Sequence, residues 1–158
     1  RSRHGNDFGV LHPITMYPCK DGWFAVNADA TFWDAFTIML DKPELMTDPR
    51  FANMPERVEH SKELDAIVIE QLGNKTRREI LDLGQRVCRV PTGILMTIPE
   101  LLEDQHLHER SFWQTITFNG QALKIPGSSF RYVGEDQPPQ AAPSLQMDAA
   151  SLARKASD

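Results

Sequence analysis

Runs of apolar residues divide the first part of the chain into a predicted strand and a predicted helix. Residues 22–27 (GWFAVN) are aromatic and β-branched and follow a Lys-Asp-Gly turn, which predicts a strand. Phe36 and Leu40 stand at helical spacing, so residues 31–40 predict a helix for which Thr31 is the expected cap.

A second helix is predicted over residues 56–72, where apolar residues recur with a period close to that of a helix. Gly73 is a plausible stop at its carboxyl end. The expected buried face of this helix comprises Val58, Leu64, Ile67, Val68 and Leu72.

Two capping boxes mark the starts of two further helices. Thr76 and Glu79 have the S/T-x-x-E spacing and open a helix that is expected to reach Val87. Thr97 and Glu100 repeat the spacing and open a short helix. The extended stretch between these helices (VPTGILMT) predicts a strand-like connection.

A β-hairpin is predicted near the carboxyl end. Residues 112–118 alternate between apolar and polar, and residues 121–125 form the returning strand. Asn119 and Gly120 between them are the strongest short hairpin signal, because both residues tolerate a positive φ. The order of strand, several helices and hairpin predicts an α+β fold.

Three segments follow from this pattern. Residues 1–21 are expected to be a loop that leads into the fold, and residues 22–131 to be a small α+β domain that includes the hairpin. Residues 132–158, rich in Pro, Gln and Ala at their start, are expected to be an extended C-terminal segment or tail. The chain begins at Arg1 without an initiator Met, as expected for a piece of a longer chain.

Composition narrows the class of protein. The net charge is −5, and apolar residues make up 41%, as in ordinary globular proteins. The mild acidity argues against nucleic acid as a partner, and no apolar run approaches the ~20 residues that span a bilayer. The two cysteines fit no disulfide framework and no CxxC zinc site, so reduced thiols in a cytoplasmic protein are expected.

Two candidate reactive groups have simpler structural explanations. Lys20 beside Cys19 would lower the pKa of the thiol, but a small buried residue at a strand edge is the favoured interpretation. Glu103 and His106 stand three residues apart, as in carboxylate-bridged metal bundles, yet the sequence shows no second such motif. We therefore expect a solvated helix end and no functional metal.

A basic stretch accompanies the third predicted helix. Such a stretch binds phosphate groups in some proteins, and more often it is the solvated face of an amphipathic helix. Its members are Lys75, Arg77, Arg78, Arg86 and Arg89.

The start of the chain mixes flexible glycines with polar side chains. Loops of this composition can bring bare backbone close to a ligand, and they also serve as plain connections, so composition alone leaves both readings open. The residues are Arg3, His4, Gly5, Asn6, Gly9, His12 and Pro13.

A series of short motifs resembles the family III coenzyme A transferases, the carnitine/formyl-CoA type. No single motif is decisive, but their order and spacing match over about residues 3 to 145. The motifs are Arg3-x-Gly5-Asn6, Tyr17-x-Cys19-Lys20-Asp21-Gly22, Phe32-Trp33-x-x-Phe36, Lys42-Pro43-Glu44-Leu45, Asp48-Pro49-Arg50-Phe51, Thr76-Arg77-x-Glu79, Val90-Pro91-x-Gly93, Glu100-Leu101-x-x-Asp104, Pro126-x-x-Phe130-Arg131 and Ala142-Pro143-x-Leu145.

This resemblance implies a two-domain enzyme of which the chain is the small domain plus a C-terminal return to a large, Rossmann-like domain. The resemblance also implies that two such chains interlock as a homodimer. The substrates are an acyl-CoA thioester and a carboxylic acid, and no cofactor is permanently bound. The implied nucleophile is an aspartate of the large domain, which attacks the thioester to give a mixed anhydride and then an aspartyl-CoA thioester. No catalytic residue is therefore expected in this chain, and the chain alone is expected to be inactive.

The resemblance also implies a role for the segment Asn6 to His12. It matches a glycine-rich loop that covers the active site and shields the intermediate from water. The implied substrate-facing residues are Gly5, Asn6, Gly9 and His12. Only Gly9 of the glycine run is present here, and a bulkier, more apolar cover suits an acyl group other than formyl or oxalyl. The departures from the run are Asp7, Phe8, Val10 and Leu11.

Two other functions remain open at the level of sequence. The first alternative is a racemase of α-methyl-branched acyl-CoA, which would have the same fold. In such an enzyme an Asp and a His move the α-proton. A non-catalytic interaction module is the alternative from a different class of protein. The C-terminal match also departs from the family pattern at Gln146, where members usually carry Gly.

Overall fold

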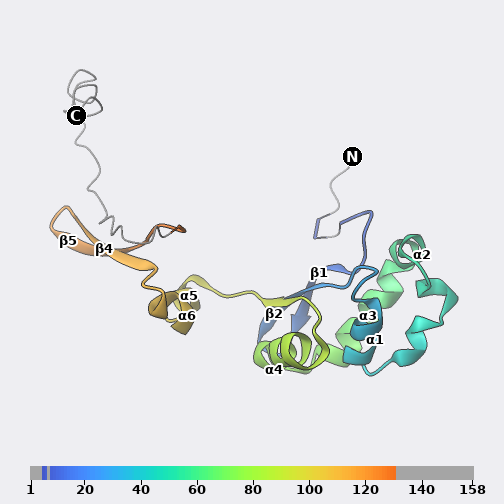
Figure 1. Ribbon diagram of the computed structural model, residues 1–158. Coiled ribbons are helices and arrows are strands. Elements are labelled where there is room, and N and C mark those ends of the chain that lie inside the picture. Colours follow the sequence, from blue (N-terminus) through green and yellow to red (C-terminus); the bar gives the residue numbers. More distant parts are fainter. Residues whose placement is uncertain (1–4, 7, 131–158) are drawn as a thin grey trace, which may run out of the picture. The chain divides into compact units, whose positions relative to one another are not determined.

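The computed structural model describes residues 5–6 and 8–130, and these fall into two compact units, residues 1–95 and residues 96–158. Figure 1 shows the elements of both units. The division lies inside residues 22–131, the range predicted as one small domain, so each unit is described separately. The predicted tail from residue 132 lies outside the described residues.

The first unit is built on a three-stranded antiparallel sheet in the order β1-β2-β3. Its strands are β1 (Ile14–Cys19), β2 (Gly22–Asn27) and β3 (Thr92–Ile94). The strand predicted at residues 22–27 is confirmed. The expected loop over residues 1–21 is wrong at residues 14–19, which form strand β1. Pro18 argued against a strand there, but proline is compatible with a strand at the edge of a sheet, where β1 lies.

Helices cover one face of this sheet. α3 packs against β1, and α4 packs against β2. The first unit contains α1 (Trp33–Met39), the 3-10 turns η1 (Pro43–Met46) and η2 (Pro49–Phe51), α2 (Met54–Glu59), α3 (Ser61–Leu72), α4 (Arg77–Leu81) and the π-helical segment η3 (Asp82–Cys88).

Three helix predictions need correction. α1 begins after Phe32, and Thr31 makes no side-chain cap. The single helix expected over residues 56–72 is two helices that meet at His60, which ends α2 and precedes α3. The helix expected to reach Val87 changes to π-helical geometry from Asp82 onward, and π-segments often mark functional sites.

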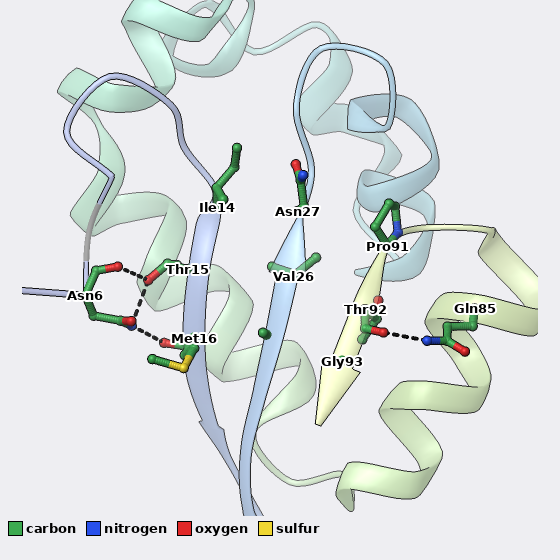
Figure 2. Close-up of a pocket in the computed structure, with 11 residues that line it drawn as sticks. Asn6, Ile14, Thr15, Met16, Val26, Asn27, Gln85, Pro91, Thr92 and Gly93 are labelled. Atoms are coloured by element: carbon green, nitrogen blue, oxygen red, sulfur yellow. Dashed lines mark hydrogen bonds between the residues drawn. The ribbon is translucent and has the colours of Figure 1, made fainter. Parts of the chain in front are cut away.

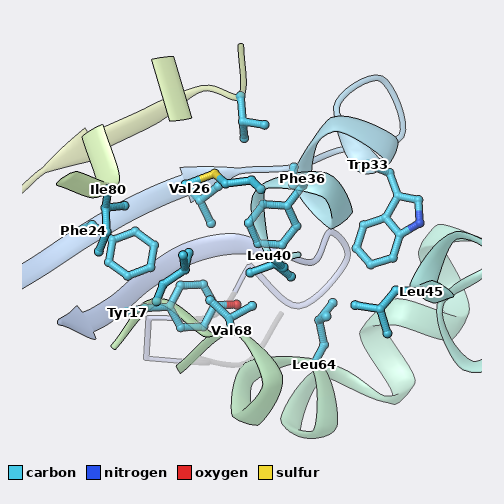
Figure 3. Close-up of a cluster of buried hydrophobic side chains, with 14 of the residues drawn as sticks. Tyr17, Phe24, Val26, Trp33, Phe36, Leu40, Leu45, Leu64, Val68 and Ile80 are labelled. Atoms are coloured by element: carbon cyan, nitrogen blue, oxygen red, sulfur yellow. The ribbon is translucent and has the colours of Figure 1, made fainter. Parts of the chain in front are cut away.

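The core of the first unit lies between the sheet and its helices (Figure 3). Side chains alternate along a strand, so Phe24 and Val26 of β2 point into this core. Leu64, Val68 and Leu72 of α3 are buried as expected, whereas Val58 and Ile67 are only partly buried.

One charged side chain of the described residues is buried in this core. Arg57 of α2 is 2% exposed and lies over the Trp33 ring, with its guanidinium carbon 4.4 Å from the ring centre. Its Nη1 donates a hydrogen bond to the Phe51 carbonyl (3.1 Å). Burial lowers the pKa of Arg57, and the aromatic face compensates part of the lost hydration of the cation.

The second unit contains two short helices and a hairpin. Its elements are α5 (Ile98–Leu102), α6 (Gln105–Glu109), β4 (Trp113–Phe118) and β5 (Gln121–Pro126). The hairpin is confirmed, and Asn119 and Gly120 have positive φ at its turn. The α+β class is therefore confirmed. In the described part of the chain, no helix has the length and apolar character needed to cross a membrane.

Candidate functional site

Polar contacts hold the segment before β1 against the first unit at both of its described ends. At one end, the Asn6 amide Nδ2 donates to Thr15 Oγ1 (2.8 Å) and to the Met16 carbonyl (2.9 Å). Thr15 Oγ1 in turn donates to the Asn6 carbonyl (3.1 Å). These bonds tie Asn6 to the edge strand β1.

The other end of this segment is fixed by His12. Its side chain is 4% exposed, and its Nε2 lies 3.1 Å from Asp65 Oδ1 on α3. The Tyr17 hydroxyl donates to the same carboxylate oxygen (2.7 Å). Burial alone raises the pKa of Asp65, but the contacts with His12 and Tyr17 together outweigh it, so this pKa lies below its ordinary value.

Between these anchors the segment exposes apolar side chains. Phe8 is 59% exposed and Val10 is 67% exposed, and Gly9 between them has φ +43°. We call residues 6–12 the cover segment. Of the expected substrate-facing residues, Gly5, Asn6 and Gly9 are exposed, whereas the His12 side chain points into the unit and serves as an anchor.

A pocket of about 600 Å³ opens beside Asn6 (Figure 2), a size within the range of small-molecule sites. It lies on the sheet face that the helices leave uncovered. It is lined by Asn6, Ile14, Thr15, Met16, Ala25, Val26, Asn27, Gln85, Pro91, Thr92 and Gly93.

The π-helical segment η3 contributes one wall of this pocket. At Gly84 a Cβ atom would lie 2.2 Å from Thr92 Oγ1, so only glycine lets η3 lie this close to β3. That approach lets Gln85 Nε2 donate to the Thr92 carbonyl (2.7 Å). A carboxamide is thereby held at the pocket, beside the end of the short strand.

Sequence reasoning missed most of this pocket. Only Asn6 was among the expected site residues, because Asn27, Gln85 and Gly93 come from segments far apart in the chain. One signal was present in the sequence. Gly93 interrupts an otherwise strand-like run, and glycine in a strand often marks the close approach of another group.

The other candidate groups are not brought into this site. Burial raises the pKa of the Cys19 thiol, and its Sγ lies 3.7 Å from Asp21 Oδ1, which disfavours a reactive thiolate. Glu103 is the residue after α5, whereas His106 lies in α6, so the two do not share a helix face. No cluster that could hold a metal occurs among the described residues.

Three residues of the basic stretch, Arg77, Arg78 and Arg86, are paired within the first unit. Arg77 donates from Nη1 to the Leu95 carbonyl (2.7 Å), and its backbone N–H donates to Asp21 Oδ1 (2.7 Å). Arg78 and Arg86 both pair with Asp82. This arrangement supports the interpretation of a solvated helix face.

Comparison with known proteins agrees with the sequence resemblance. CoA-transferase family III matches residues 1–149. Succinyl-CoA–D-citramalate CoA-transferase of Chloroflexus aurantiacus is 37% identical over 112 residues, which are 70% of this chain and 28% of the relative. Formyl-CoA:oxalate CoA-transferase of Rhodopseudomonas palustris is 29% identical over 112 residues, which are 66% of this chain and 26% of the relative.

The fold is also found in a solved structure. A CAIB/BAIF family protein from Brucella suis superposes with a TM-score of 0.71 at 22% identity, over 99% of this chain and 40% of that protein. The chain therefore spans between about a quarter and two fifths of the length of these relatives. On the match over residues 1–149, the chain belongs to CoA-transferase family III.

Proposed function

We propose that the protein containing this chain transfers coenzyme A between an acyl-CoA and a carboxylic acid. Family membership supports this activity, because the named relatives are CoA-transferases. In this proposal an aspartate carboxylate outside these 158 residues attacks the thioester carbonyl, which forms a mixed anhydride and releases CoA as a thiolate. The thiolate then attacks the aspartyl carbonyl, which gives an aspartyl-CoA thioester and releases the acyl group as its carboxylate. Residues 1–158 alone are therefore inactive. The acyl-CoA is a substrate, and no resident cofactor is required.

The role proposed for this chain is to cover the reacting groups. The observation that carries it is the cover segment, which is anchored at Asn6 and His12 and exposes apolar side chains between them. Fixed ends limit the entropy lost when such a segment closes over a substrate, and an apolar tip excludes water. Gly5, Asn6 and Gly9 are the proposed substrate-facing positions, and His12 positions them.

The oligomeric state and the cellular location of the full-length protein are part of the same proposal. We propose a homodimer of the full-length protein, in which this chain packs with its own large domain. A cytoplasmic location is supported by the two free cysteines, Cys19 and Cys88. Gel filtration with light scattering of the full-length protein would show two chains per particle.

The cover segment can be tested through the fate of the intermediate. Replacing Phe8 and Val10 by Ala in the full-length protein should admit water, so hydrolysis of acyl-CoA should rise by roughly tenfold relative to transfer. Both side chains are exposed, so the melting temperature should stay unchanged. The measurement is free CoA released with and without the acceptor acid.

A matched control is Ile38→Ala, since Ile38 is 59% exposed, like Phe8, and lies on α1. This variant should keep the wild-type ratio of hydrolysis to transfer. An unchanged ratio in the Phe8→Ala/Val10→Ala protein would contradict the covering role. Exchange of the α-hydrogen of a branched acyl-CoA, without any transfer, would instead indicate a racemase.

A further inference from the structure

His12 is the boundary between the exposed part of the cover segment and the fixed backbone of the first unit. Its backbone N–H donates to Met54 Sδ on α2 (3.2 Å). The carbonyl of the next residue, Pro13, accepts from the Ala28 N–H (2.9 Å), directly after β2. The exposed apolar side chains of the cover segment precede this point, so the position of His12 determines where they stand.

The side chain of His12 is held in the unit by Asp65. The imidazole is 4% exposed, whereas the Asp65 side chain is 29% exposed. The His12 Nε2 lies 3.1 Å from Asp65 Oδ1, but it makes no aligned hydrogen bond among the described residues. A buried ring nitrogen without a polar neighbour costs free energy. Without the carboxylate, the ring would therefore be drawn out toward water.

The carboxylate of Asp65 is itself held by two elements. Asp65 stands three residues before the buried Val68 on α3, so it borders the helix face that packs on β1. The Tyr17 hydroxyl of β1 donates to Asp65 Oδ1 (2.7 Å), and the Tyr17 side chain belongs to the core. The acceptor for His12 therefore has a fixed place between α3 and β1.

Stability alone does not explain a polar pair at this place. Apolar residues of similar volume often replace a buried ionic pair without loss of stability, because the pair pays for its attraction with lost hydration. Apolar contacts have no preferred direction, whereas a carboxylate and an imidazole bring two particular atoms together. The pair is therefore explained by the need for one defined position of the backbone at His12.

We propose that Asp65 is a positioning residue for the transfer reaction. Through His12 it holds the cover segment where the exposed apolar side chains exclude water from the reacting groups, and Tyr17 orients its carboxylate. Asp65 acts without touching the substrate. This inference rests on the proposed function, and it adds a residue that lies outside every motif of the family resemblance.

The first test measures hydrolysis and transfer by the full-length protein. Asp65→Leu should raise hydrolysis of acyl-CoA relative to transfer by about tenfold, and it should leave the KM for acyl-CoA within about twofold of wild type. Asp65→Asn keeps one acceptor oxygen and should give a smaller rise, and it carries the test if the leucine variant does not fold.

A matched control separates positioning from a general loss of stability. Val68→Ala opens a cavity on the same helix, three residues from Asp65, so it should lower the melting temperature. It should leave the ratio of hydrolysis to transfer at the wild-type value. A rise in this ratio equal to that of Asp65→Leu would overturn the proposal.

A double-mutant cycle tests whether Asp65 acts through His12. His12→Leu should raise the ratio of hydrolysis to transfer about as much as Asp65→Leu does. The double variant should raise it no further, because both changes remove the same contact. Effects that multiply in the double variant would show that the two residues act independently, which would overturn the proposal.

Amide hydrogen exchange of the full-length protein gives a measurement that does not depend on activity. The peptide that contains the His12 amide should exchange faster in Asp65→Leu than in wild type, and Val68→Ala should leave its exchange unchanged. Unchanged exchange in Asp65→Leu would overturn the positioning role alone. Faster exchange in that variant, with no transfer by wild type, would overturn the proposed function alone.

Discussion

The two compact units of this chain exclude water to very different degrees. Fifteen of the described residues of the first unit form its buried hydrophobic core, among them Phe24, Phe36 and Phe51, each with no exposed surface. In the second unit, none of the described residues 96–130 is buried. Burial of apolar surface is the main source of stability, so the two units must be held in different ways.

Local hydrogen bonds define the elements of the second unit. Thr97 and Glu100 form a capping box, and the Asp104 carboxylate accepts from the Leu107 N–H (2.9 Å). An isolated two-stranded hairpin is marginally stable in water, and Phe118 remains 55% exposed on its strand. The comparison shows that a segment can form regular helices and strands without being a stable unit. Local hydrogen bonds are enough to form the elements, whereas a stable unit also needs buried apolar surface.

The largest expected effect comes from removing the same side chain in each unit. Phe36→Ala should lower the free energy of unfolding by about 3–5 kcal/mol, because it leaves a cavity in the core. Phe118→Ala should change it by no more than about 0.5 kcal/mol, since this ring is largely in solvent. Urea unfolding followed by far-UV circular dichroism measures both values, and similar losses in the two variants would contradict the comparison.

A smaller effect is expected from the partly buried polar contact of the first unit. Asp65→Asn should cost about 1–2 kcal/mol at neutral pH, because the charged acceptor shared by His12 and Tyr17 is lost. Asp104→Asn is the control in the second unit. Asn caps a helix about as well as Asp, so this variant should change stability little.

The pH dependence of the Asp65 effect has a definite sign. The folded-state pKa of Asp65 lies below its ordinary value, so the contribution is fully present above about pH 4 and is lost as the pH falls through the folded pKa. The stability difference between wild type and Asp65→Asn should therefore shrink in acid. A difference that is constant from pH 7 to pH 2 would show that the carboxylate charge contributes nothing.

Sequence predicted the features of the fold that depend on neighbours in the chain. Both capping boxes, at Thr76 and at Thr97, are present with reciprocal hydrogen bonds. The turn at Asn119 and Gly120 is also where it was expected. In each case the interacting atoms lie within three residues of one another, so the pattern carries the whole of the required information.

Features that depend on distant residues were not predicted. Arg57 is not part of the predicted buried face of residues 56–72, and only the fold brings it over Trp33. Strand β1 was not predicted because it contains Pro18, which is compatible with a strand only at a sheet edge. The pocket joins Asn6, Gln85 and Gly93 from separate segments, so the sequence indicated the cover segment but not the cavity beside it.

The smallest predicted effect is a matched pair of cap deletions. Thr76→Ala and Thr97→Ala each remove a side chain that accepts from the N–H of the Glu three residues on. Each change should cost about 1 kcal/mol locally, and Thr→Ser at either position should restore most of it. The losses of stability at Thr76 and at Thr97 should nevertheless be detected by different measurements.

α4 packs on β2 and contributes Ile80 to the core, so the loss at Thr76 should reach the whole first unit and appear in its urea unfolding. α5 contributes no buried residue, so the loss at Thr97 should appear only as faster amide hydrogen exchange in residues 98–102. If Thr97→Ala instead lowered the urea midpoint as much as Thr76→Ala, α5 would unfold together with the core. The contrast between a core-stabilised unit and a locally stabilised one would then have to be abandoned.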